Sequence, residues 1–204
     1  QKKKELLERA LKINEIHYGP EHPSTGQTLT NLGNAYSSLG NYQKQKEVLE
    51  RAFKITEIHY GPDHPQTGIT LGSLGNAYGD LGNYQKKKEL LQRALKNFEF
   101  HYGPDHPQTG ITLTNLGTAY GALGNYQKQK ELLERALIIN EFHYGPDHPS
   151  TGITLWGLGD AHRDLGNKKA ALAYYQKAYK TFITHNHPHA KHVKKRIENL
   201  EERP

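Results

Sequence analysis

Apolar side chains recur along this chain at spacings of three and four residues, with polar residues between them. One such stretch contains Leu71, Leu74, Ala77, Tyr78 and Leu81. This spacing puts the apolar residues on one side of a helix and predicts an amphipathic helix of about 16 residues. A second helix is predicted from Tyr84, and its apolar side is expected to carry Leu90, Leu91, Ala94, Leu95, Phe98 and Phe100. No stretch alternates apolar and polar residues as a half-buried strand does, so the pattern predicts an all-α protein.

Proline, glycine and asparagine separate the predicted helices. Pro65 suits the first position of a helix, where its missing N–H would have no partner in any case. Gly82 can take the left-handed backbone that ends a helix, and Asn83 can cap the next one. Gly103-Pro104 ends the second helix in a similar way. The predicted unit is therefore a helix, a tight turn, a second helix and a loop.

This unit is repeated along the chain. The tetrad His-Tyr-Gly-Pro begins at His17, His59, His101 and His143, each 42 residues after the one before. A fixed period of this length is the signature of a tandem array in which each unit packs on its neighbours. We therefore expect one array over residues 1–204. Its expected parts are a partial repeat with only a second helix (1–16), four repeats (22–58, 64–100, 106–142 and 148–184) and a capping helix (188–202).

The order of small and large residues within the unit resembles tetratricopeptide repeats. The first full unit has Leu32-Gly33, Ala35-Tyr36, Gly40-Asn41-Tyr42 and Ala52, and this order recurs in the later units. A mid-helix glycine such as Gly33 costs about 1 kcal/mol relative to alanine, which is tolerable where two helices must approach closely. The long unit with its Gly-Pro-Asp-His-Pro connection is similar to the variant found in kinesin light chains. The resemblance implies a right-handed α-α superhelix whose first helices line a concave groove.

Two features depart from the family's pattern. Ala171 fits a small position early in the second helix, but the earlier units carry larger residues there: Lys3, Gln45, Lys87 and Gln129. We expect a slightly different crossing of the two helices at this point. The last unit also diverges, because His162 replaces a tyrosine and the loop after it is shortened. Any distinctive chemistry is therefore expected in the last unit.

The composition agrees with an elongated array. Only 34% of the residues are hydrophobic and the mean hydropathy is −0.86, which is little for a single globular core. The absence of cysteine excludes disulfides, zinc–thiolate sites and cysteine nucleophiles. No run of about 18 apolar residues predicts a membrane span. We expect a piece of a longer array, located in the cytoplasm.

No motif for catalysis or cofactor binding is present in the sequence. The most suggestive cluster is Asp160, His162, Arg163 and Asp164. Residues two apart on a helix point to different faces, so Asp160 and His162 are poorly placed to share one proton. We predict no enzyme activity and no cofactor.

Histidine pairs five residues apart recur in the loops, as His17 with His22 and again at each repeat. Such a ladder could bind zinc or copper. It could equally be loop structure, with one histidine near the negative end of a helix and the other before the helix-opening proline. A denser group could capture metal adventitiously: His185, His187, His189 and His192. A specific site needs three or four convergent ligands, so we predict no metal site.

The resemblance places a partner on the first helices. The residues expected to bind it are Asn31, Asn34, Asn76, Asn115, Thr118, Trp156, Asp160 and Arg163. An asparagine amide can both donate to and accept from an extended peptide. Trp156 beside Asp160 and Arg163 has the composition of a binding hot spot. It could equally pack beneath the C-terminal cap, and the sequence leaves both places open.

These features favour a protein-interaction scaffold that binds a partner peptide or helix in the groove. The alternative is a structural spacer or an array that associates end to end through the apolar stripe of the first helix, which includes Leu6 and Ile13. A lesser alternative is nucleic-acid binding through a basic convex or C-terminal surface, because the net charge is +6. The 21 acidic residues among the basic ones, and the lack of aromatic residues beside the lysines, argue against it.

Overall fold

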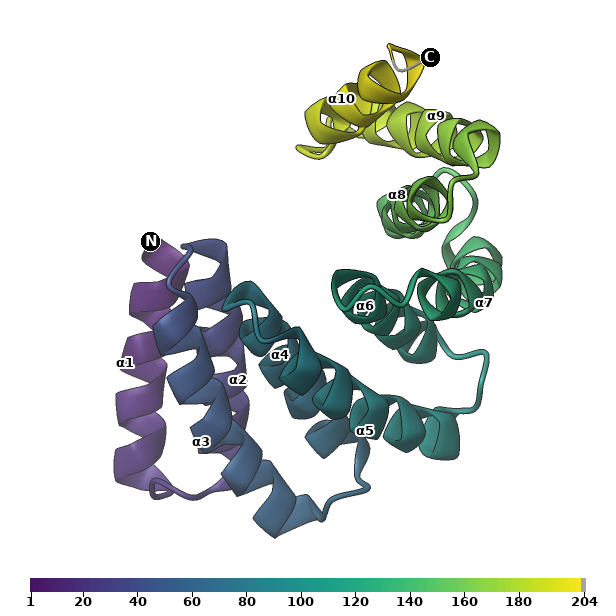
Figure 1. Cartoon of the computed structure of the whole chain (residues 1–204). Helices are drawn as coiled ribbons and strands as arrows, with labels where there is room; N and C mark the ends of the chain where they lie inside the picture. Colours follow the sequence, from purple (N-terminus) through teal and green to yellow (C-terminus); the bar gives the residue numbers. More distant parts are fainter. Residues whose placement is uncertain (203–204) are drawn as a thin grey trace. The chain divides into compact units, whose positions relative to one another are not determined.

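The computed structural model describes residues 1–202, and this part of the chain contains ten α-helices and no strand. The predicted all-α fold class is therefore confirmed. The helices form two compact units, residues 1–101 and the residues from 102 onward. Figure 1 shows the helices coloured along the chain.

The first unit contains five helices that pack in chain order. Their bounds are α1 Lys2–His17, α2 Pro23–Ser38, α3 Tyr42–Tyr60, α4 Pro65–Asp80 and α5 Tyr84–Tyr102. The last residue of α5 begins the second unit. A core cluster joins Leu49 of α3, Leu74 of α4 and Leu90 of α5. Phe100 is a correction to the predicted core of α5, because its side chain is 80% exposed.

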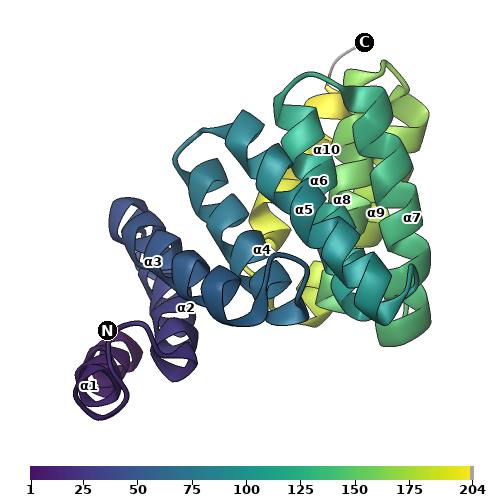
Figure 2. The ribbon, with the colours of Figure 1, turned by 90° about the horizontal axis from the view of Figure 1, so that it is seen from below.

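The second unit contains the other five helices. Their bounds are α6 Pro107–Ala122, α7 Tyr126–Tyr144, α8 Pro149–Asp164, α9 Lys168–Thr184 and α10 Ala190–Glu201. Helices α6 to α9 lie side by side in Figure 2. The last helix was predicted from Pro188 but begins at Ala190, because the N–H groups of His189 and Ala190 both bond to His187, at 3.3 and 3.1 Å. We call α2, α4, α6 and α8 the first helices, and α1, α3, α5, α7 and α9 the second helices.

Histidine caps the N-terminus of every first helix. The Nδ1 atom accepts a hydrogen bond of 3.0–3.1 Å from the N–H two residues later, at His22, His64, His106 and His148. This bond satisfies one of the N–H groups that a helix leaves unpaired at its start, and proline follows at the first helical position. Because Nδ1 must accept, the capping form of each imidazole is neutral.

Histidines near the ends of α3, α7 and α9 join these second helices to the loop of the preceding repeat. The Nε2 atom donates to a loop carbonyl in three places: His59 to Glu21 at 2.7 Å, His143 to Asp105 at 2.7 Å, and His185 to Asp147 at 2.9 Å. These bonds hold consecutive loops together along one edge of each unit. In the pairs His59/His64 and His143/His148, both histidines therefore have a structural role.

Glycine lets the first and second helices of a pair approach closely. A Cβ atom on Gly33 would lie 2.6 Å from the Cγ atom of Leu49, which is fully buried. Gly121 leaves room for the side chain of Gln129 at the position where the sequence predicted a departure from the family. The larger residue there is thus accommodated by a smaller one on the facing helix. In the last pair the sizes at these two positions are reversed, with Arg163 and Ala171.

Aromatic contacts join α10 and the residues just before it to the rest of the second unit. The Trp156 ring of α8 lies 5.0 Å from the His189 ring and 6.5 Å from the His192 ring, between centroids. His187 stacks on Phe182 of α9 at 4.7 Å. Val193 is the residue of α10 that is fully buried. Ala190, Ile197 and Leu200 of α10 also pack against this core, so rings and aliphatic side chains together hold the C-terminal helix.

Gly159→Ala should destabilise the fold. A Cβ at Gly159 would collide with the ring of Tyr175, which is fully buried and bonded to Asp160 at 2.7 Å. Overpacking of this kind costs about 1–3 kcal/mol. Alanine recovers about 1 kcal/mol of helix propensity, so we expect a net loss of about 1 kcal/mol in the free energy of unfolding. Urea denaturation followed by circular dichroism measures it.

Gly72→Ala is the matched control for that substitution. Gly72 also lies in the middle of a first helix, but no atom lies within 4 Å of the Cβ that alanine would add. Only the gain in helix propensity remains, so this variant should be more stable by up to about 1 kcal/mol. Equal effects of the two substitutions would contradict the close approach at Gly159.

The docking of α10 should weaken in acid. Burial, and then the neighbouring His187 and His192, lower the pKa of His189 below its ordinary value of 6.5. The unfolded chain therefore takes up this proton more readily than the folded chain does. The contribution of His189 to stability is complete above pH 6.5 and is lost as the pH falls from there toward the lower pKa of the folded chain.

Trp156 reports on this docking because it is the only tryptophan of the chain. Its emission should move to longer wavelength as the pH is lowered from about 7.5 to about 5, where histidines titrate. His189→Phe keeps a ring at this place but removes the titrating group, so the shift should become smaller. Far-UV circular dichroism over the same range is the control for global unfolding. An unchanged fluorescence titration in His189→Phe would refute this explanation.

Candidate functional site

The predicted binding residues of the first unit lie on the solvent side of α2 and α4. Asn31 and Asn34 are exposed, and Asn76 is half-buried. Within residues 1–202, the side-chain amides of these three residues form no hydrogen bond. Helix packing thus leaves them free to bond to another molecule.

In the second unit, the first helices α6 and α8 border an open pocket of about 100 Å³. Ile111 and Asn115 of α6 and Ile153 of α8 line it. Both isoleucines are 37% exposed, so the entrance is partly apolar. The pocket can accept one small apolar side chain beside an amide.

Asn140 of α7 also lines this pocket, and the sequence analysis did not identify it. It is 1% exposed, and its Nδ2 atom donates to the Oγ1 atom of Thr154 at 2.9 Å. Its Oδ1 atom is buried without a hydrogen-bond partner among the described residues. The sequence offers one signal for it: Asn140 occupies the position of the 42-residue repeat that is phenylalanine in the repeats before and after it, at Phe98 and Phe182.

Thr118 is exposed but bonded within its own helix. Its Oγ1 atom donates to the backbone carbonyl of Asn115 at 2.7 Å. The hydroxyl oxygen keeps its capacity to accept a hydrogen bond from a ligand.

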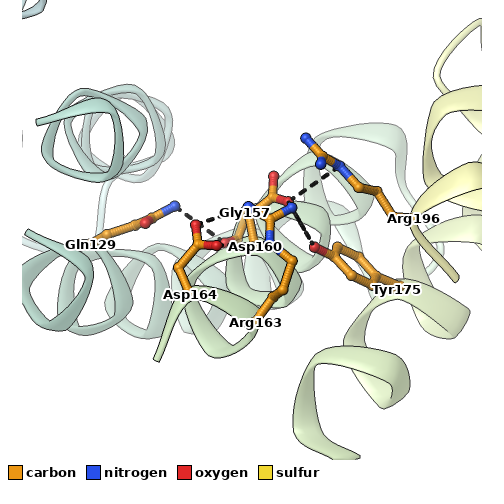
Figure 3. Close-up of polar contacts among 7 residues, drawn as sticks. All are labelled: Gln129, Gly157, Asp160, Arg163, Asp164, Tyr175 and Arg196. Atoms are coloured by element: carbon orange, nitrogen blue, oxygen red, sulfur yellow. Dashed lines mark hydrogen bonds and ion pairs between the residues drawn. The ribbon is translucent and has the colours of Figure 1, made fainter. Parts of the chain in front are cut away.

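Asp160 lies at the centre of a charged network at the end of α8 (Figure 3). Its Oδ1 atom accepts from Arg163 Nη1 at 2.8 Å and from the hydroxyl of Tyr175 at 2.7 Å. Arg196 of α10 lies 3.6 Å from the same oxygen. Arg163 also forms a bidentate pair with Asp164, at 2.7 and 2.8 Å. The predicted binding residues Asp160 and Arg163 are therefore engaged with their own chain.

This network holds its protons tightly. Burial, followed by the charge and hydrogen bond of Asp160, raises the pKa of Tyr175. The hydrogen bond to Asp164 makes the largest upward contribution to the pKa of the Arg163 guanidinium. Neither group is suited to exchange a proton with a substrate near neutral pH.

Trp156 lies between α8 and α10 and is half-buried. Its Nε1 atom is buried and, among the described residues, has no hydrogen-bond partner. The sequence left two places open for Trp156, a partner-binding surface or a position beneath the C-terminal helix, and the indole lies beneath that helix. Trp156, Asp160 and Arg163 thus lie together at the α10 end of the second unit, and Asn115 lies in the pocket between α6 and α8.

His162 takes no part in the Asp160 network. Its ring stacks on Tyr174 at 5.3 Å, and its Nδ1 atom is buried without a partner in the described part of the chain. Burial is the main cause that lowers the pKa of His162. It is therefore a mainly neutral packing residue at neutral pH.

The dense histidine group stacks on rings and does not converge on one point. His189 lies 4.8 Å from His187 and 6.2 Å from His192, measured between ring centroids. Over residues 1–202, no group of three or more histidine, cysteine or acidic side chains is arranged to hold a metal ion.

The lysines at the start of the second helices pair with nearby carboxylates. The ion pairs are Lys86–Glu89 at 3.1 Å, Lys128–Glu131 at 2.9 Å and Lys130–Glu134 at 3.4 Å. This part of the surface is mixed in charge. No helix among the described residues has both the length and the apolar character needed to cross a membrane.

Comparison with known proteins identifies the repeat. Two sequence models, both described as tetratricopeptide repeat, match the chain: one at residues 46–99, 82–139 and 130–183, and the other at residues 25–66. No curated protein matches the chain.

Solved structures give the same result. A putative kinesin light chain from Podosopora anserina with nearly identical TPR-like repeats is 27% identical, with a TM-score of 0.70 over 87% of this chain and 84% of that chain. A variant of it is 26% identical, with a TM-score of 0.72 over 90% and 86%. BtubC (BKLC) from P. vanneervenii shares the fold at 21% identity, with a TM-score of 0.75 over 89% and 72%. The predicted resemblance to kinesin light chain-type repeats is confirmed, and the chain belongs to the tetratricopeptide repeat family.

Proposed function

We propose that this chain is a protein-interaction module that binds an extended peptide along its first helices. The observation that carries the proposal is the pocket between α6 and α8, where Ile111 and Ile153 flank Asn115. An extended peptide offers what this surface can use, namely an apolar side chain and backbone N–H and C=O groups. Tetratricopeptide repeat proteins are generally scaffolds without enzyme activity, and the fold is consistent with that role.

The pocket sets the expected chemistry of the partner. Residues lining it are apolar or carry neutral polar groups: Ile111, Thr114, Asn115, Asn140, Ser150 and Ile153. Because none of these six is charged, a terminal carboxylate or an acidic side chain gains nothing there. Burying a side chain the size of valine or leucine contributes about 1.5–3 kcal/mol. The preferred peptide therefore carries an aliphatic residue flanked by neutral ones.

The amides of the first unit support the same mode of binding. Asn31, Asn34 and Asn76 have free donors and acceptors on the first helices of that unit. They can bond to a peptide backbone whatever its side chains are. We infer that these amides give the first unit a surface that binds peptide backbone, whereas the pocket of the second unit binds an apolar side chain.

At the other end of the second unit, the network around Asp160 has a different role in this proposal. The carboxylate holds Arg163, Tyr175 and Arg196 and so joins α8, α9 and α10. Trp156 is covered from the same side by His189 and His192. In this proposal Asp160 and Arg163 serve to attach α10 and are not contacts of the peptide.

A peptide selected from a random library on the whole chain tests the proposal. Ile111→Ser with Ile153→Ser should raise its Kd at least about tenfold, because the pocket loses more than about 1.4 kcal/mol of apolar burial. Titration calorimetry measures the change, and a circular dichroism melt checks that the variant is folded.

Lys128→Ser is the matched control for this experiment. Lys128 is exposed on α7 and pairs with Glu131, away from the residues that line the pocket. It should leave the Kd unchanged. Peptides whose affinity survives the double isoleucine substitution, or falls with Lys128→Ser instead, would contradict binding in the pocket.

A further inference from the structure

Large apolar side chains stand in solvent at the ends of the second helices. In the first unit, Ile16 is 80% exposed, Ile58 is 74% exposed and Phe100 is 80% exposed. They occupy the same position of the 42-residue repeat on α1, α3 and α5. Packing within the fold gains little from them, and exposed apolar patches mark interaction sites.

Ring contacts link the ends of α3 and α5, and the hydrogen bond from His59 to the Glu21 carbonyl links the end of α3 to the loop after α1. Tyr18 stacks on His22 at 4.9 Å, and Tyr60 stacks on His64 at 4.7 Å. The His64 ring lies 6.4 Å from His101, which in turn contacts Phe100 at 5.0 Å. We call Ile16, Tyr18, Ile58, Tyr60 and Phe100 the aromatic edge.

A pocket of about 170 Å³ opens beside Ile58 on this edge. Its lining includes Ile55, which is 3% exposed, and the loop residues Pro20 and Glu21. Arg51 Nη2 donates to the carbonyl of Pro20 at 3.0 Å, and His59 donates to that of Glu21 at 2.7 Å. The loop wall is thus fixed, so the pocket exists before any ligand enters.

We propose that two copies of this chain associate through the aromatic edge of the first unit. The edge carries a projecting apolar side chain, Ile58, next to an apolar-floored pocket. A two-fold axis places the same patch on both copies, so that each can insert into the other. The charges around it are mixed: the exposed Lys54 and Lys96 stand among the exposed Glu21 and Asp63. Two copies can therefore oppose unlike charges, whereas a strongly charged partner would meet both signs.

The second unit does not repeat the edge in full. Phe142 is 82% exposed and borders a pocket of about 270 Å³ with Ile138 and Ile139. The residue at the same position of the next repeat is Thr184, which is polar. The first unit is therefore the one with three successive apolar side chains, and the proposed contact is assigned to it.

The exposed area predicts a weak dimer. An aromatic side chain buries about 150–250 Å² when fully covered. With the exposed fractions of Tyr18, Tyr60 and Phe100, at 59, 41 and 80%, and the two isoleucines, each copy can bury about 500 Å² of apolar surface. The total of about 1,000 Å² lies at the lower limit for a specific interface. We expect a Kd of tens of micromolar, about 6 kcal/mol of binding free energy.

Analytical ultracentrifugation of the whole chain from about 1 to about 300 µM tests this range. The weight-average mass should rise from that of the monomer toward twice that value. Ile58→Lys with Phe100→Lys should weaken the dimer at least about tenfold, because two central apolar contacts become charged. These side chains are exposed, so circular dichroism melts should match those of the unmodified chain.

Two further double variants make the test specific. Ile138→Lys with Phe142→Lys changes side chains that are 70 and 82% exposed on the second unit, and it should leave the dimer intact. Leu6→Lys with Ile13→Lys changes the 54 and 53% exposed side chains of α1 through which chains could stack end to end. It should also leave the dimer intact.

A monomer at every concentration would overturn the proposal. A dimer that persists in Ile58→Lys with Phe100→Lys, or that is lost equally in either of the other two variants, would overturn it as well. The aromatic edge lies apart from the peptide-binding residues proposed above, so failure of either proposal leaves the other standing.

Discussion

Each helix pair is held together where a glycine of the first helix leaves room for a side chain of the second. Gly33 receives Leu49 in this way, and Gly159 receives Tyr175. A mid-helix glycine costs about 1 kcal/mol of helix propensity. This cost is offset because the side chain that packs against the glycine, Leu49 or Tyr175, becomes fully buried. The shared contact fixes which side of the first helix packs on its partner. It therefore also decides which side chains, such as Asn31 and Asn34, are left for other molecules.

The loops depend on histidine as the helix pairs depend on glycine. In the pairs His59/His64 and His143/His148, one imidazole accepts from the start of a first helix, and the other donates to the loop of the preceding repeat. The accepting nitrogen must be unprotonated, whereas the donating nitrogen carries a hydrogen. With the loops held in this way, the Tyr60 ring stacks on His64 and the His64 ring lies near His101, and these contacts form part of the aromatic edge. The outer edge and the binding face thus arise from different bonds of the same repeat.

The sequence predicted the helices well because their limits are set by local chemistry. Gly82 has a φ of +80°, and the Asn83 side chain accepts from Lys86, as its pattern indicated. The exposure of Phe100 was missed although Phe100 follows Phe98 by two residues, and residues two apart on a helix point to different faces. Asn140 was missed for a related reason: a buried amide on a second helix has meaning only through Thr154, a residue of another helix. The family resemblance named Asp160 and Arg163 for a partner, but no pattern in the sequence could assign both to Tyr175.

The last repeat differs from the others where α10 packs on it. Tyr175 stands at the register position of Leu49 and buries a hydroxyl that needs a partner, and Asp160 supplies it at 2.7 Å. A half-buried carboxylate in turn requires positive charge, which Arg163 and the Arg196 side chain of α10 provide. Tyr175, Asp160, Arg163 and Arg196 thus form one network that links α8, α9 and α10. The Asp160 carboxylate, which the family resemblance assigned to a partner, instead attaches α10 to the helices beside it.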